Sequence, residues 1–309
     1  MTLIIIQSQR VGFFKGLSIE KDNEFSGFRE QWKHIFKHLK NRINSWCSSK
    51  GAPDLPENIF HPHSPYLNIY VYPTELDFKL FNTWEFKDWI QIDCLSKRET
   101  PKKLVIPELL SCGQGKLIYL SMGSFASVGI MKRLIDILSE SPNKFIVSKG
   151  PFHSQYHLPN NMWGLEDIPL TDVIQSVNLV ITCGDTKTII QCFLNAKPMI
   201  VLPLFGDQLD NRIRLKENGF GWGLDPFNCN KETLLCMIHS IIDDKALNRR
   251  LNTIAKSMDC SITNKQIADQ IDNLIYRLQQ QKQKIIDKNI ETLKLFSTNK
   301  PQTTTMAED

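Results

Sequence analysis

The chain has 309 residues, which is long enough for two lobes that each bury a core. Hydrophobic residues make up 41% of the chain and charged residues 23%, as is usual for a soluble globular protein. The formal net charge of +4 is spread along the chain, and basic runs such as Lys33–Arg42 are short, so we expect a solvated surface and no nucleic-acid partner.

The N-terminal region begins with an apolar run, Leu3–Ile6, that is too short for the core of a signal peptide. From Phe25 to Trp46 apolar residues recur at helical spacing opposite a basic face, which predicts an amphipathic helix. A Ser/Gly/Pro-rich linker ends that helix, and Tyr66–Tyr72 follows as a predicted strand bounded by prolines. Residues 77–113 lack clear periodicity, and we interpret them as loop with short strands.

From Lys116 onwards, predicted strands and helices alternate. Short apolar runs of the kind that buried parallel strands require lie at 117–121, 144–149, 179–182 and 199–203. Amphipathic helices are predicted around 131–138, over 186–195 and 208–218, and around 234–242. Gly219 is a plausible stop for the third of these helices. This alternation predicts an α/β fold with a doubly wound parallel sheet.

The C-terminal region is again helical. Asn264–Phe296 carries an apolar stripe that the polar run 279–284 interrupts. Residues 299–309 are polar and predict a disordered tail. No stretch of the sequence approaches the ~18 apolar residues of a membrane span, and we expect a cytoplasmic protein without a membrane segment.

The eight cysteines form no CxxC pair and no paired Cys/His spacing. This distribution argues against a structural zinc site or a disulfide framework and favours buried, reduced thiols. No cluster of carboxylates follows a predicted strand, so we expect no metal site.

Three predicted strand ends are followed by turns that are polar or contain glycine: SMGSF at 121–125, TCGDTKT at 182–188 and PLFGDQ at 203–208. Ligands of open parallel sheets bind outside the carboxyl ends of the strands. The first two turns precede helices, whose N-terminal amides favour an anion such as a diphosphate. Each turn alone is weak evidence for a ligand site, whereas three such turns at successive strand ends indicate one.

The chain resembles the family-1 UDP-glycosyltransferases in KLIYLSMGSFAS, LPNNMWG, LVIT, AKPMIVLPLFGDQLDN and KENGFG, which follow in the family's order and spacing. The resemblance covers roughly Lys116 to Met258, with a looser likeness over SPYLNIYVYPTELDF; PMIVLPLFGDQLDN is its most specific part. It implies the two Rossmann-like lobes of the GT-B fold. It also implies transfer of a hexosyl group from a UDP-sugar to a hydroxyl of a small lipophilic acceptor, with the UDP-sugar as co-substrate and no other cofactor.

The resemblance divides the chain and assigns its donor contacts. Residues 1–115 are a partial acceptor-side α/β lobe, 116–260 the nucleotide-sugar-binding lobe, 261–298 a C-terminal helix and 299–309 the tail. Gly123 and Ser124 match the family's strand-end Gly-Ser, and Asp207 and Gln208 match the pair that binds donor-sugar hydroxyls. The expected donor-binding residues are Gly123, Ser124, Cys183, Gly184, Thr186, Thr188, Gln191, Asp207 and Gln208.

The turn at 183–188 departs from the family's H-G-G-x-N-S/T pattern. Cys183 replaces the histidine that contacts the diphosphate, and Asp185 places a carboxylate beside the phosphates. Gln191 replaces the acid that holds the ribose hydroxyls. Lys187 could partly replace the lost charge, although we interpret it as a solvated lysine.

The segment that holds uracil in the family also departs from the family's sequence pattern in this chain. Of the family's W-x-P-Q signature, Pro169 remains, with Asp167 in place of the stacking aromatic and Leu170 in place of the glutamine. Trp163 lies earlier in the sequence, and we interpret it as a packing residue.

The family's catalytic base is a histidine in the first strand-to-helix turn of the N-terminal lobe, where it deprotonates the acceptor hydroxyl. Residues 1–115 contain no histidine in such a turn, and they are fewer than the ~150 residues of a complete lobe. We therefore assign no catalytic residue. Three interpretations stay open: a glycosyltransferase homologue with an eroded donor site, a non-catalytic binding or interaction protein on the same scaffold, and a fragment of an active enzyme.

Overall fold

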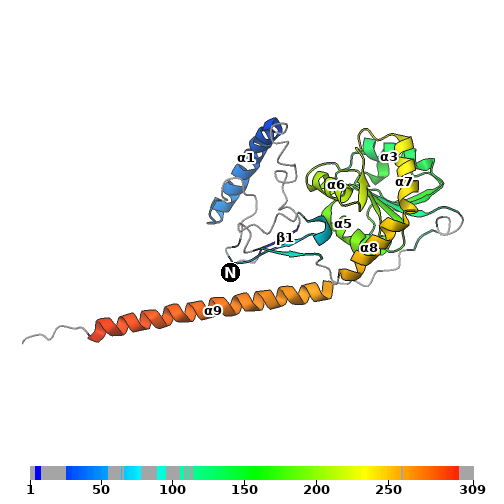
Figure 1. Ribbon diagram of the computed structural model, residues 1–309. Coiled ribbons are helices and arrows are strands. Elements are labelled where there is room, and N and C mark those ends of the chain that lie inside the picture. The colour runs from blue at the N-terminus through cyan, green and yellow to red at the C-terminus, as the bar shows by residue number, and fades with distance from the viewer. Residues whose placement is uncertain are drawn as a thin grey trace, which may run out of the picture. The chain divides into compact units, whose positions relative to one another are not determined.

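The computed structural model describes residues 4–7, 26–54, 64, 66–77, 89–94, 105–107, 110, 114–258 and 260–298. It divides into two compact units, Met1–Cys260 and Ser261–Asp309, whose helices and strands are labelled in Figure 1.

The first unit contains a small parallel sheet with the strand order β1-β2-β3. Its strands are β1 (Ile4–Gln7), β2 (Asn68–Val71) and β3 (Trp89–Ile92), and the helix α1 (Ser26–Ser49) lies between β1 and β2 in the chain. The central strand β2 is buried along its whole length, as a strand paired on both sides should be. The predicted N-terminal helix and the predicted strand at 66–72 are both confirmed, the strand in shortened form.

A larger parallel sheet in the same unit has the order β6-β5-β4-β7-β8-β9. Its strands are β4 (Leu117–Ser121), β5 (Lys144–Ser148), β6 (Met162–Leu165), β7 (Leu179–Thr182), β8 (Met199–Val201) and β9 (Gly221–Gly223). Its helices are α3 (Val128–Ser139), α4 (Leu170–Ile174), α5 (Thr186–Leu194), α6 (Asp207–Glu217), α7 (Lys231–Ile242) and α8 (Lys245–Ser257). Short 3₁₀ helices lie at η2 (Thr74–Leu76) and η5 (His153–Gln155).

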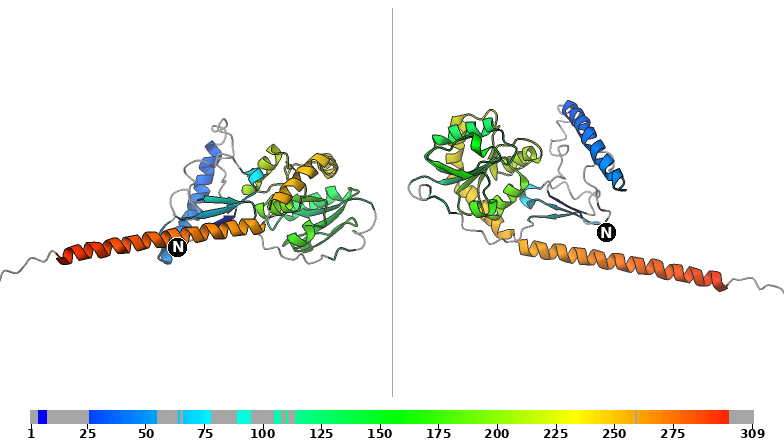
Figure 2. Two further views of the ribbon diagram at one scale, coloured as in Figure 1. Left: turned by 60° about the horizontal axis from the view of Figure 1, so that its bottom comes forward. Right: turned by 180° about the vertical axis from the view of Figure 1, so that it is seen from behind.

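The order of the larger sheet reverses between β4 and β7. From β4 the chain moves outwards through β5 to β6, and from β7 it moves the other way through β8 to β9. Because parallel crossovers are right-handed, the helices of the two halves lie on opposite faces, and α3 contacts α7 whereas α5 contacts α4, α6 and α8 (Figure 2). The doubly wound parallel sheet is therefore confirmed.

The core strands of this sheet match the predicted apolar runs closely. β4 and β7 have the predicted bounds, and every residue of β7 is buried. The apolar face of α3 is buried as well, through Met131, Leu134, Ile135 and Leu138. The elements without a prediction are β6, α4, β9 and α8. Two of them are short and glycine-containing, and in β6 a Cβ at Gly164 would collide with the carbonyl oxygen of Val147 on β5.

The helix α9 (Cys260–Thr298) lies in the second unit from its second residue onwards. The predicted helix over 264–296 is confirmed, and the predicted tail at 299–309 lies outside the described residues. Among the helices of the described part of the chain, none is both long and apolar enough to cross a membrane.

Candidate functional site

The strand-end turns predicted to bind a ligand meet where the strand order reverses. β4 and β7 are neighbours, so the turns that follow them lie side by side at the carboxyl edge of the sheet, where open α/β sheets bind their ligands. A Cβ added to Gly123 would lie 3.6 Å from the Sγ atom of Cys183, which places these two turns against each other. Gly123 and Gly184 have φ values of +66° and +87°, a backbone conformation that residues other than glycine rarely adopt. Gly123 and Ser124 are exposed at this edge of the sheet.

Asp185 is the N-cap of α5. Its Oδ1 atom accepts a hydrogen bond from the Thr188 backbone N–H at 3.0 Å, and its Oδ2 atom accepts one from the Thr188 hydroxyl at 2.7 Å. The family resemblance predicts that this carboxylate lies beside the phosphates of a donor. The structure shows in addition that the carboxylate binds an amide at the helix N-terminus, the kind of group that binds phosphate in other proteins.

Cys183 is almost fully buried, with 3% of its surface exposed. Its Sγ atom lies 3.9 Å from Oδ2 of Asp185. Burial, followed by the Asp185 charge, raises the pKa of the thiol to about 11. The side chain at the histidine position is therefore a neutral thiol at physiological pH and offers no positive charge to a diphosphate.

Thr186, Asp207 and Gln208 come together beside this turn. The Thr186 hydroxyl donates a hydrogen bond to Oδ2 of Asp207 at 3.1 Å. Gln208 is buried, and its Oε1 atom accepts hydrogen bonds from the backbone N–H groups of Leu204 at 2.8 Å and Phe205 at 3.3 Å. Both predicted sugar-binding residues thus lie at the start of α6. The side-chain carbonyl of Gln208 stabilises the turn that precedes this helix.

Other predicted residues lie farther from this group along the chain. Gln191 is half-buried on α5, Asp167 is exposed in the turn after β6, and Leu170 begins α4. Trp163 is half-buried within β6, in register with Ile146 of β5. The packing role of Trp163 and the donor role of Gln191 stay predictions.

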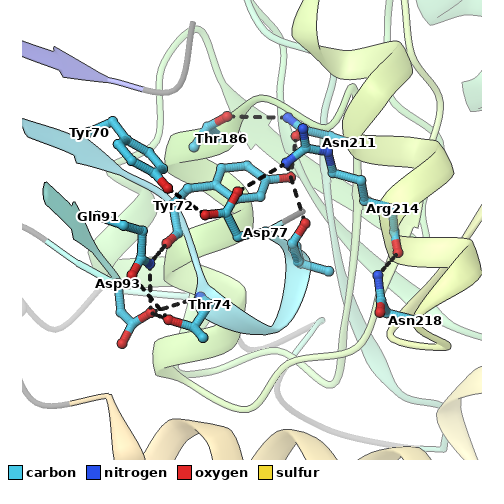
Figure 3. A network of polar contacts seen from close by, with 11 residues as sticks. Tyr70, Tyr72, Thr74, Asp77, Gln91, Asp93, Thr186, Asn211, Arg214 and Asn218 are labelled. Atoms are coloured by element: carbon cyan, nitrogen blue, oxygen red, sulfur yellow. Dashed lines mark hydrogen bonds and ion pairs between the residues drawn. The ribbon is translucent and has the colours of Figure 1, made fainter. Parts of the chain in front are cut away.

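Asn211 is a site residue that sequence reasoning missed. It is 2% exposed, and its Nδ2 atom donates hydrogen bonds to the carbonyl of Gly184 at 2.9 Å and to the Thr186 hydroxyl at 3.2 Å. Its Oδ1 atom accepts a hydrogen bond from the Tyr72 hydroxyl at 2.7 Å (Figure 3). The available signal was its position one helical turn after Asp207, within the segment that carries the family resemblance.

Two charged residues of α6, Asp210 and Arg214, lie close to this group of residues. Arg214 is 2% exposed, with its guanidinium carbon 4.8 Å from the centre of the Tyr72 ring and Nη1 3.9 Å from Oδ1 of Asp77. Burial raises the pKa of Asp210 to about 6, with the Arg214 charge lowering it and the Asp207 charge raising it further. Among the described residues, Oδ2 of Asp210 is buried without a hydrogen-bond partner.

The described part of the chain contains no group of three or more His, Cys, Asp or Glu side chains that could hold a metal ion. Six of the cysteines are described as free thiols: Cys47, Cys94, Cys183, Cys192, Cys229 and Cys236.

Comparison with protein families agrees with this geometry. The profile of the family described as "UDP-glucoronosyl and UDP-glucosyl transferase" matches residues 68–261. The chain belongs to this family. The match includes β2 of the small sheet as well as the whole of the larger sheet. The similarity of this UDP-glycosyltransferase homologue to the family therefore extends beyond the larger sheet.

The curated relatives are longer than the parts that align with this chain. Human UDP-glucuronosyltransferase 1A8 is 25% identical over 246 residues, 72% of this chain and 44% of the relative. Human UDP-glucuronosyltransferase 3A2 is 31% identical over 91 residues, 29% of this chain and 17% of the relative. The chain therefore spans less than half the length of these curated relatives.

Two solved glycosyltransferases share the fold at low sequence identity. The glycotransferase of kitacinnamycin aligns with a TM-score of 0.62 at 19% identity, over 80% of this chain and 67% of that structure. The calicheamicin glycosyltransferase CalG4 aligns with a TM-score of 0.58 at 16% identity, over 82% of this chain and 65% of that structure. The predicted GT-B type of fold is therefore confirmed.

Proposed function

We propose that this homologue binds a UDP-sugar at the carboxyl edge of the sheet, outside β4, β7 and β8, and that it binds the donor weakly. The turns with Gly123, Ser124, Thr186, Asp207 and Gln208 supply the donor contacts. The observation that carries the proposal of weak binding is the hydrogen bond from the Thr188 amide to Asp185. A diphosphate at the N-terminus of α5 has to compete with this carboxylate for the amide and tolerate its charge.

The expected loss of affinity follows from two missing interactions. Loss of base stacking at Asp167 costs about 1–3 kcal/mol. Loss of a charge-assisted hydrogen bond at Cys183 costs about 1.5–3 kcal/mol. Together they correspond to roughly two to four decades in affinity, so we expect UDP to bind with a millimolar Kd.

The reaction is proposed from the family. It is the transfer of a hexosyl group from the UDP-sugar to a hydroxyl of a small lipophilic acceptor. A glycosyltransferase with a TM-score of 0.55 to this chain, VinC, was solved in complex with DTDP, which supports a nucleoside diphosphate as the ligand of this fold.

Calorimetry with UDP, UDP-glucose and UDP-glucuronate tests the proposal on the full chain and on Asp185→Gly. Glycine at an N-cap costs only a few tenths of a kcal/mol, so the variant should fold. We expect millimolar binding of UDP by the unmodified chain and at least a roughly tenfold gain in Asp185→Gly, the gain that corresponds to ~1.4 kcal/mol.

The matched control is Asp244→Gly, which removes the N-cap carboxylate of α8, where Asp244 accepts hydrogen bonds from Ala246 and Leu247. This control should leave the affinity for UDP unchanged. Low-micromolar binding of UDP by the unmodified chain would contradict the proposal, and so would an equal gain in both variants.

A further inference from the structure

A chain of hydrogen bonds runs from Tyr72, directly after β2, to the carboxylate of Asp207. Figure 3 shows Tyr72, Asn211 and Thr186, the first three residues of this chain. The Tyr72 hydroxyl donates to Oδ1 of Asn211 at 2.7 Å, and Nδ2 of Asn211 donates to the Thr186 hydroxyl at 3.2 Å. The Thr186 hydroxyl in turn donates to Oδ2 of Asp207 at 3.1 Å. A hydroxyl has one proton, and Thr186 gives it to Asp207. Thr186 must therefore act as the acceptor in its hydrogen bond with Asn211, so all the bonds of the chain point in one direction.

Asn211 also holds the backbone of the donor turn. The second proton of its Nδ2 atom goes to the carbonyl oxygen of Gly184 at 2.9 Å. A flipped amide would direct its oxygen at that carbonyl oxygen and its NH₂ group at the Tyr72 hydroxyl. The observed orientation uses both protons and the oxygen of a side chain that is 2% exposed, so this network is satisfied and rigid.

The Tyr72 end of the chain is held firmly by α6 and η2. Tyr72 is 2% exposed, and the guanidinium of Arg214 lies over its ring. Arg214 itself donates to the carbonyl oxygen of Leu76 at 3.3 Å and lies 3.9 Å from the carboxylate of Asp77. The phenol is thus fixed from one side by cation–π contact and at its oxygen by Asn211.

We propose that Tyr72 and Asn211 are positioning residues that set the orientation of Asp207 and the shape of the 183–186 turn. This inference rests on the proposed function, in which Asp207 binds the hydroxyls of the donor sugar. Both residues act through Thr186 and Gly184, outside contact with the donor. The segment at the end of β2 thereby sets how strongly the site prefers a UDP-sugar over UDP.

The first test needs no ligand. Tyr72→Phe keeps the ring under Arg214 and removes the hydroxyl, so the turn beside Cys183 should open more often. Alkylation of Cys183 in the full chain, resolved by peptide mass spectrometry, should be about 2- to 10-fold faster, the range expected for loss of one neutral hydrogen bond. Cys192 on α5, which is fully buried, is the internal reference.

Tyr156→Phe is the matched control variant. Its hydroxyl donates to the carbonyl oxygen of Lys149 at 2.5 Å, outside the chain from Tyr72 to Asp207. Asn211→Ala removes three hydrogen bonds and should accelerate alkylation more than Tyr72→Phe does. Unchanged alkylation of Cys183 in Tyr72→Phe would overturn the inference.

The second test measures the Kd of UDP-glucose and of UDP in Asp185→Gly, with and without Tyr72→Phe. We expect Tyr72→Phe to weaken UDP-glucose by about 2- to 10-fold and to weaken UDP less, because opening of the 183–186 turn affects the diphosphate of both ligands, whereas Asp207 contacts only the sugar. Equal weakening of both ligands would indicate a general structural role and overturn the inference. If neither ligand binds even in Asp185→Gly, the proposed donor site is wrong, and the alkylation rates alone decide the positioning role.

Discussion

At the scale of single residues, Asp185 shows how one side chain changes a ligand site while preserving the fold. An aspartate at an N-cap stabilises a helix because its carboxylate accepts hydrogen bonds from the first amides. In this chain the carboxylate accepts from both the amide and the hydroxyl of Thr188. The residue that weakens the proposed diphosphate site therefore stabilises the helix that forms it.

This dual role predicts a stability change. Asp185→Ala should lower the free energy of unfolding by about 1 kcal/mol, because alanine cannot cap α5, whereas Asp185→Ser should stay close to the unmodified chain. Urea denaturation of the full chain checks both variants. Equal stability of Asp185→Ala and Asp185→Ser would contradict the capping role.

Asp210 predicts a dependence of stability on pH. Its pKa is raised from 3.8 to about 6, so the folded state binds this proton more tightly than the unfolded chain does. Protonation therefore favours folding, and the penalty for burying the charged carboxylate is largest above pH 6 and disappears as pH falls towards 3.8. The groups that interact with this carboxylate are Arg214, which lowers the pKa, and Asp207, which raises it.

We expect Asp210→Asn to be more stable than the unmodified chain at pH 7.5 and the difference to shrink between pH 6 and pH 4. Urea midpoints measured across this range test the prediction, and the difference between the two chains removes the contribution of titrating groups that do not interact with Asp210. A difference that is constant with pH would show that Asp210 titrates near its ordinary value in the folded state.

At the scale of elements, β6 depends on a glycine for its pairing with β5. A Cβ at Gly164 would collide with the backbone oxygen of Val147, and backbone atoms of a buried strand have little room to move. Gly129 on α3 is a contrasting case, because a Cβ there would lie 3.8 Å from the Ser127 hydroxyl, an ordinary contact.

Gly164→Ala should therefore destabilise the first unit by more than about 2 kcal/mol. Gly129→Ala should instead stabilise it by about 0.5–1 kcal/mol, since alanine is the better helix residue. Thermal unfolding of the two variants beside the unmodified chain gives the comparison. Similar effects of the two substitutions would show that the β5–β6 pairing tolerates a side chain at residue 164.

At the scale of the whole molecule, donor binding and transfer are separable. Restoring the family's residues with Cys183→His, Asp185→Gly and Gln191→Glu should strengthen UDP binding by roughly two decades or more, through recovered phosphate and ribose contacts. Transfer also needs a base at the acceptor hydroxyl, and we assign none of the histidines of residues 1–115 to that role. Loss of a general base costs about 10²–10⁴-fold in rate.

We therefore expect neither the unmodified chain nor the repaired chain to transfer sugar. The assay is radiolabelled UDP-sugar with a panel of phenolic acceptors, and calorimetry on the same samples reports binding. Product above the buffer blank from the unmodified chain would refute both the eroded donor site and the missing base.

Four of the six strands of the larger sheet, β4, β5, β7 and β8, could be predicted from sequence because a buried parallel strand is a continuous apolar run, a local property that 117–121 and 179–182 both have. The turns that follow them could be placed at one edge because parallel strands share their carboxyl ends. β9 could not be predicted because Gly221–Gly223 contains a single large side chain and so forms no apolar run. It is a strand because its backbone pairs with β8.

The amino-acid sequence by itself thus determined the fold class, the family and the residues of the strand-end turns, since each of these follows from short segments and their order. Only the tertiary structure decided what those residues do to one another. The bond between Tyr72 and Asn211 joins residues 139 positions apart, and the burial of Arg214 over the Tyr72 ring depends on how α6 packs against β2 and η2. Hydrogen-bond partners across such separations are set by packing in three dimensions, which no local pattern of polar and apolar residues encodes.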